Sequence, residues 1–172
     1  RLRRSGTTTS IDLSWNFLGS SHLVLLAAAL PGHPTLTSLD LSHNRLCDCW
    51  IDEWGRQHGA VRTDGIAALA KVLGETYKSR ACALKVLDLR ASHVRDPERR
   101  LADALQRNRS IAILNGMDLG TEATELDLTD RRPSTARLVG LDAYEASFIG
   151  SRLAGGFADE LDVLLIPDKH LG

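Results

Sequence analysis

Apolar and polar positions alternate in a pattern that recurs along the chain. Residues 8–18 read TTSIDLSWNFL and residues 36–46 read LTSLDLSHNRL, an offset of 28. Both segments match the spacing L-x-x-L-x-L-x-x-N-x-L, with Thr8 in place of the first leucine. Apolar residues at every second position predict a short strand with one buried face. We therefore expect strands near 10–13 and 38–41.

A helical spacing follows each of these strand segments. Apolar residues three to four positions apart predict one buried helix face; they are Leu23, Leu26 and Leu30 after the first segment, and Ile66, Leu69 and Leu73 after the second. We expect helices near 20–30 and 63–76.

A third copy opens with LKVLDL at 84–89. Asp96 followed by Pro97 is typical of a helix start, because aspartate caps free N–H groups and proline suits the first turn. We expect a strand near 86–89 and a helix near 97–107.

The later copies are less regular. Ile111 and Leu114 begin a short, irregular copy that ends at Leu119, and further strands are expected near 125–128 and 163–166, with a helix near 140–155. The central strand residues are separated by 28, 48, 39 and 38 positions; they are Ile11, Leu39, Leu87, Leu126 and Leu164. These gaps predict one repeated unit with insertions.

The repeated unit resembles the ribonuclease-inhibitor type of leucine-rich repeat. The resemblance is carried by IDLSWNFL at 11–18, LDLSHNRL at 39–46 and TDGIAALAKVL at 63–73. It implies an α/β leucine-rich-repeat solenoid, with a curved parallel sheet inside, helices outside and about five degenerate repeats with insertions. It also implies a role in protein binding. We expect residues 1–172 to form one domain, a segment of a longer array, with degenerate repeats over 105–172.

Stacking explains why such units fold together, since one strand and one helix cannot bury their apolar faces alone. The expected core leucines are Leu13, Leu26, Leu39, Leu41, Leu69, Leu73, Leu87, Leu89, Leu126 and Leu128. Asn16 and Asn44 have amides that can bond the backbone where the chain leaves each strand, forming an asparagine ladder. Ser92 and Arg131 stand at that position in later copies, and we expect them to replace asparagine poorly.

Composition narrows the class of protein. The formal net charge is −1 with 25% charged residues, which argues against a nucleic-acid binder. The longest apolar run, Leu23–Leu30, is far shorter than the roughly 20 residues of a membrane span, so no membrane association is expected. The low, odd number of cysteines (three) and the absence of a signal-peptide pattern predict an intracellular, cytoplasmic protein.

An insertion at 47–61, CDCWIDEWGRQHGAV, interrupts the second copy between its strand and its helix. Long loops on rigid scaffolds often carry function, and tryptophan and arginine are frequent interface anchors. Trp50, Trp54 and Arg56 are therefore candidate partner-binding residues. The alternative is that the insertion covers the edge of the repeat stack. We expect one tryptophan to be packed and the other exposed.

A column of aspartates is the second candidate site. Asp12, Asp40, Asp88 and Asp127 share one outward strand position, which predicts an acidic stripe on the concave face. A partner with a basic segment would relieve the repulsion between these carboxylates. The alternative is that aspartate simply suits this position of the repeat. Further candidate contacts beside the stripe are Ser14, Trp15, Ser42, His43 and Arg90.

Catalytic motifs and metal-ligand patterns are not recognisable in the sequence. The metal candidates are Cys47, Cys49 and His58, but the two cysteines lack the usual C-x-x-C spacing and no second pair follows, so we expect no metal. Because no catalytic motif is present, we also expect no cofactor and no enzymatic activity. The sequence therefore favours a protein–protein interaction module. The alternative is a GTPase-activating or regulatory module of the same repeat class, which rests on fold analogy alone.

Overall fold

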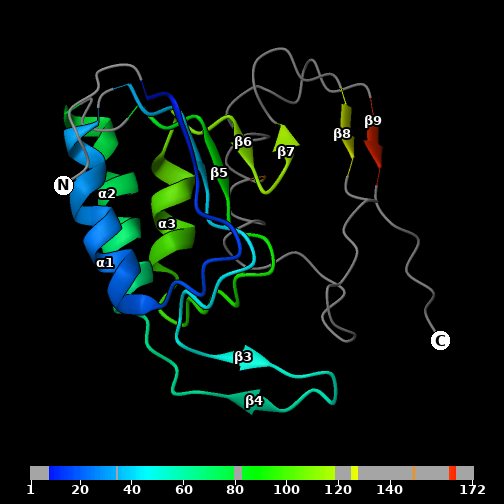
Figure 1. Ribbon diagram of the computed structural model, residues 1–172. Coiled ribbons are helices and arrows are strands. Elements are labelled where there is room, and N and C mark those ends of the chain that lie inside the picture. Colours follow the sequence, from blue (N-terminus) through cyan, green and yellow to red (C-terminus); the bar gives the residue numbers. More distant parts are fainter. Residues whose placement is uncertain are drawn as a thin grey trace.

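The computed structural model describes residues 8–33, 35–79, 83–118, 125–127, 149 and 163–165 (Figure 1). In chain order the elements are β1 (Ser10–Asp12), α1 (Ser20–Ala29), the short 3-10 helix η1 (Leu30–Gly32), β2 (Ser38–Asp40), β3 (Trp50–Ile51), β4 (Gln57–His58), α2 (Asp64–Ser79), β5 (Val86–Asp88), α3 (Arg100–Arg107), β6 (Ile113–Leu114), β7 (Met117–Asp118), β8 (Glu125–Asp127) and β9 (Val163–Leu165). We call β1 with α1 unit 1, β2 with α2 unit 2, and β5 with α3 unit 3.

The fold is mixed α/β and is built on a mostly parallel five-stranded sheet of order β1-β2-β5-β6-β7. The register places Ile11 beside Leu39, Leu39 beside Leu87, and Leu87 beside Leu114. The offset of 28 thus predicts the first pairing correctly. The fourth strand is centred on Leu114 rather than on Leu126, which lies in β8 and pairs with β9 in a separate two-stranded parallel sheet.

Helices α1, α2 and α3 lie on the same side of the sheet, and α2 contacts both of the others (Figure 1). Helices α1 and α2 begin within a residue of their expected starts. Helix α3 begins at Arg100, three residues later than expected. Pro97 and Glu98 form a turn before it, which is closed by a hydrogen bond from the Arg99 N–H to the Asp96 carbonyl. The helix expected at 140–155 lies outside the described residues except for Ile149.

The core lies between the sheet and the helices. Six of the expected core leucines are at most 1% exposed: Leu39, Leu41, Leu69, Leu73, Leu87 and Leu89. Leu13 and Leu26 are only partly buried, contrary to expectation, because β1 and α1 stand at the edge of the described elements, with β2 and α2 beside them on one side. The side chains of Leu126 and Leu128 lie outside the described part of the chain.

The antiparallel hairpin β6–β7 was not predicted. Its two-residue turn is Asn115-Gly116, with φ of 53° and 79°. Two consecutive left-handed residues of this type form the turn that best matches the twist of a tight hairpin. The Asn-Gly pair between short apolar segments was therefore a signal available in the sequence.

Candidate partner-binding surface

The chain leaves the first strands of the sheet through similar turns. Trp15, His43 and Ala91 follow β1, β2 and β5, and each adopts the left-handed backbone region, with φ of 57°, 54° and 52°. Backbone bonds hold the turns in register, since the Trp15 N–H donates to the Ser42 carbonyl and the His43 N–H to the Arg90 carbonyl. The Trp15 and His43 rings consequently stack, with centroids 4.0 Å apart and planes 7° from parallel.

Asn44 connects the turns of units 1 and 2. Its buried Oδ1 accepts the N–H groups of Asn16 and Leu18, at 3.1 and 2.9 Å, and its Nδ2 donates to the carbonyls of Leu13 and Leu41. The Asn16 side chain is exposed, and its Nδ2 donates to the Ser14 carbonyl of its own turn. The two asparagines occupy equivalent positions but have different surroundings, because among the described units Asn44 has one stacked on each side and Asn16 has one on a single side.

Ser92 takes the asparagine position in unit 3. Its hydroxyl donates to the Leu41 carbonyl at 2.6 Å and accepts the Asn44 N–H at 3.3 Å. A serine hydroxyl therefore maintains the link to unit 2 with fewer bonds than an amide makes. Arg131 lies outside the described residues.

Asp12, Asp40 and Asp88 lie side by side in the sheet. Each Oδ1 accepts the backbone N–H two residues ahead, at 2.8, 2.8 and 2.9 Å, which is the usual role of aspartate in a turn. Bonds from Ser14 hold the pKa of Asp12 below its ordinary value. Asp127 is not part of this column, since it pairs with Leu165 in the β8–β9 sheet.

Accessibility differs along the column. Asp12 is exposed and Asp40 is half-buried, whereas Asp88 and Ser42 are buried. Arg90 covers Asp88, with Nη2 2.6 Å and Nε 2.9 Å from Oδ2. The acidic surface that remains open is therefore formed by units 1 and 2.

The insertion is a two-stranded antiparallel hairpin of β3 and β4 (Figure 1), in which Trp50 pairs with His58. Asp52 organises its tip, because Oδ1 accepts the N–H groups of Trp54 and Arg56, while Oδ2 lies 2.9 Å from Arg56 Nε and 2.8 Å from His58 Nε2. The bond to His58, together with those from Arg56 and Trp54, lowers the pKa of Asp52 to about 2. The hairpin is thus ordered by its own side chains.

The projecting part of the insertion is shorter than 47–61. Cys47 and Cys49 are free thiols that lie in the core, at most 1% exposed. The Arg62 N–H donates to the Cys47 carbonyl at 2.9 Å and closes the base of the hairpin. Gly59 has a φ of 79° and lies against the backbone of Asp48. A Cβ at this position would overlap the Asp48 carbonyl oxygen. The excursion therefore runs from Trp50 to His58.

The Cys47 thiol is buried and bonded to the backbone at Arg95. Burial raises the pKa of Cys47 to about 11, so the sulfur stays protonated, and Sγ accepts the Arg95 N–H at 3.1 Å. Across the described ranges, no group of three or more His, Cys, Asp or Glu side chains is arranged to hold a metal ion.

Arg45 joins the hairpin to the turn of unit 1. Its Cζ lies 4.0 Å from the Trp50 ring centroid and 5.2 Å from that of Phe17, and Trp50 also stacks on His58. Trp50 is half-buried by these contacts, whereas Trp54 is 69% exposed at the tip, with Arg56 4.8 Å from its ring centroid. The expectation of one packed and one exposed tryptophan is confirmed.

Sequence reasoning missed Phe17 and Arg45, although both follow directly after a ladder asparagine. Phe17 is 73% exposed and Trp15 is 71% exposed. We call the set formed by these residues and the hairpin the exit surface; it comprises Trp15, Phe17, His43, Arg45, Trp50, Trp54 and Arg56. It combines exposed aromatic rings with guanidinium groups on an ordered backbone.

Comparison with models of known protein families and with curated protein sequences finds no match for this chain. Within the part of the chain that the structure describes, no helix is long and apolar enough to cross a membrane.

Proposed function

We propose that the chain is a leucine-rich-repeat module of the ribonuclease-inhibitor-like type that binds a protein partner through the exit surface and catalyses no reaction. The parallel register of units 1, 2 and 3, the asparagine link between turns and the helices on one side of the sheet support the repeat assignment. Stacked units of this kind form a solenoid with a continuous core. The buried free thiols Cys47 and Cys49 favour an intracellular location.

One observation carries the binding role: Trp15, Phe17 and Trp54 are each about 70% exposed on turns whose backbone is fixed by hydrogen bonds. Large aromatic side chains on a surface are an aggregation risk, and they are enriched among the residues that dominate binding energies. A pre-ordered surface also loses little conformational entropy on binding. These features favour recognition of a protein surface.

Site-specific photo-cross-linking tests this proposal. A benzoylphenylalanine at position 54 should cross-link a specific protein in cells, whereas the same group at Lys71, exposed on α2, should not. With the purified partner, Trp54→Ala should weaken binding by about tenfold or more, as expected for an interface anchor. Equal cross-linking from both positions, or unchanged affinity of Trp54→Ala, would contradict the proposal.

A further inference from the structure

Arginines of this chain already cover part of the exit surface and the neighbouring Asp88. Arg45 lies over Trp50, Arg56 lies over Trp54, and Arg90 pairs with Asp88. In each case a guanidinium group is held against an aromatic face or a carboxylate. These three contacts show that the aromatic faces and the carboxylate at these positions bind guanidinium groups.

Trp15 is different from the other two tryptophans. Its ring contacts His43, and no arginine among the described residues lies over it, although the side chain is 71% exposed. The electron-rich face of an indole is the best cation–π acceptor among the side chains. The accessible surface of Trp15 is therefore suited to a cation from outside the chain.

Asp40 and Asp12 differ from Asp88 because no arginine among the described residues is paired with them. Serine stands two residues after each of them, where unit 3 has Arg90. Within the described residues neither carboxylate forms an ion pair. Their charge is complementary to the cation that Trp15 favours.

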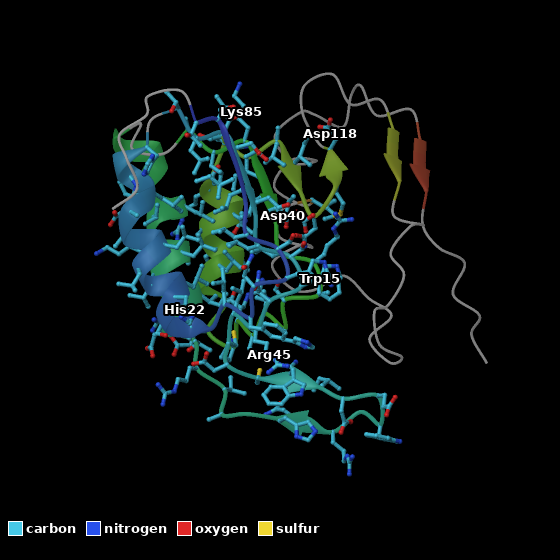
Figure 2. The ribbon with its side chains drawn as sticks, viewed as in Figure 1. Trp15, His22, Asp40, Arg45, Lys85 and Asp118 are labelled. Carbon is cyan, nitrogen blue, oxygen red and sulfur yellow. The ribbon has the colours of Figure 1, made fainter. Side chains whose placement is uncertain are left out.

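Trp15 and Asp40 belong to adjoining turns. The Leu13 N–H donates to the Asp40 carbonyl at 2.9 Å, and the Trp15 N–H donates to the Ser42 carbonyl at 3.2 Å. The N–H of the same Ser42 donates to Asp40 Oδ1. Figure 2 shows both labelled residues on the strand side of the molecule, away from the helices.

We propose that the partner docks an arginine-containing segment on Trp15 and Asp40, an inference that rests on the proposed function and names the chemistry of its partner. One guanidinium group pairs with Asp40 as Arg90 pairs with Asp88, and another lies over Trp15 as Arg45 lies over Trp50. Arginine fits better than lysine, because its planar group binds carboxylates in bidentate fashion and stacks on aromatic rings.

The test uses the full chain and a short synthetic peptide of alternating arginine and glycine, at low ionic strength where surface charges are least screened. The Trp15 indole N–H signal in a nitrogen–proton NMR spectrum should shift in a saturable way. By calorimetry, Asp40→Asn and Trp15→Leu should each weaken binding by about fivefold or more. Asparagine retains the Oδ1 that accepts the Ser42 N–H, so Asp40→Asn removes charge while keeping the turn.

Asp103→Asn on α3 is the matched control for Asp40→Asn and should bind the peptide as the wild type does. A peptide with lysine in place of arginine should bind more weakly, and one with glutamate should not bind. An unmoved Trp15 signal, or equal affinities of Asp40→Asn and Asp103→Asn, overturns the inference. Cross-linking at position 54 tests the proposed function independently, so the two failures are distinguishable.

Discussion

Asp48 caps helix α1 from the neighbouring unit: its Oδ1 accepts the backbone N–H of Ser20, 28 residues earlier, at 2.9 Å. The N-cap residue of α1 is Gly19, which has no side chain to do this. A Cβ on Gly19 would overlap the Asp48 carboxylate. The glycine is thus required for the capping contact between units 1 and 2.

Removing this cap should destabilise the fold. Asp48→Ala should lower the free energy of unfolding by about 1 kcal/mol, the usual effect of losing a cap. Urea denaturation followed by circular dichroism measures it. Asp48→Asn, which retains an acceptor oxygen, should lose clearly less. Equal losses for both variants would show that the cap is not what Asp48 contributes.

Asn44 and Asn16 provide a matched pair for the asparagine ladder. Asn44→Ala should cost about 3 kcal/mol, because it leaves the N–H groups of Asn16 and Leu18 and the Leu13 carbonyl without the amide that binds them. Asn16→Ala should cost about 0.5 kcal/mol, since its amide is exposed. Urea denaturation of the two variants checks this order, and a reversed order would contradict the ladder.

Leu41 and Leu25 test the packing in the same way. Leu41 is fully buried, so Leu41→Ala should lower the free energy of unfolding by about 2–5 kcal/mol. Leu25 is 71% exposed, and Leu25→Ala should change it by less than about 0.5 kcal/mol. Thermal and urea unfolding measure both. A loss below about 0.5 kcal/mol for Leu41→Ala would place this residue outside the core.

The hairpin should respond to acid through Asp52. Its pKa in the fold is lowered to about 2, from an ordinary value of 3.8. A lowered pKa means that the bonds to the carboxylate stabilise the hairpin above pH 3.8, and that this stabilisation is lost as the pH falls towards 2. The Trp54 indole NMR signal should move towards its unstructured position over that range.

Asp52→Asn is the control for this titration. Asparagine cannot titrate and cannot pair with His58 or Arg56 as an anion, so the acid-dependent movement of the Trp54 signal should disappear. A variant that keeps the wild-type titration would show that another group is responsible.

The sequence predicts the regular part of the fold because its determinants are local and periodic. The spacing of Ile11 and Leu39 predicts their pairing, and the leucines of β2 and β5 are buried as the alternation requires. The sequence did not indicate that Leu114 forms the next strand of the main sheet. Its copy has no asparagine at the ladder position and ends in a hairpin at Gly116.

The exit surface was less predictable because it depends on contacts between distant segments. Trp50 and Trp54 could be predicted as candidate binding residues from their residue type alone. The position of Arg45 between Phe17 and Trp50 depends instead on where the hairpin folds back. The spacing of apolar residues in the sequence does not indicate such a contact. The same holds for Asp52, whose bonds define the hairpin tip.

The role of the exit surface can be tested most directly with a shortened hairpin. Replacing residues 51–57 with Asn-Gly joins Trp50 to His58 through a tight turn and removes Asp52, Trp54 and Arg56, while the closure between Cys47 and Arg62 remains. Stability should change little, because the replaced segment lies outside the core cluster.

The decisive measurement is the affinity of this shortened variant for the partner cross-linked at position 54, compared with that of Lys71→Ala as control. The account predicts binding weakened by about tenfold or more at an unchanged melting temperature, with the control unaffected. Wild-type affinity of a folded, shortened variant would show that the hairpin is not a recognition element and would contradict the account.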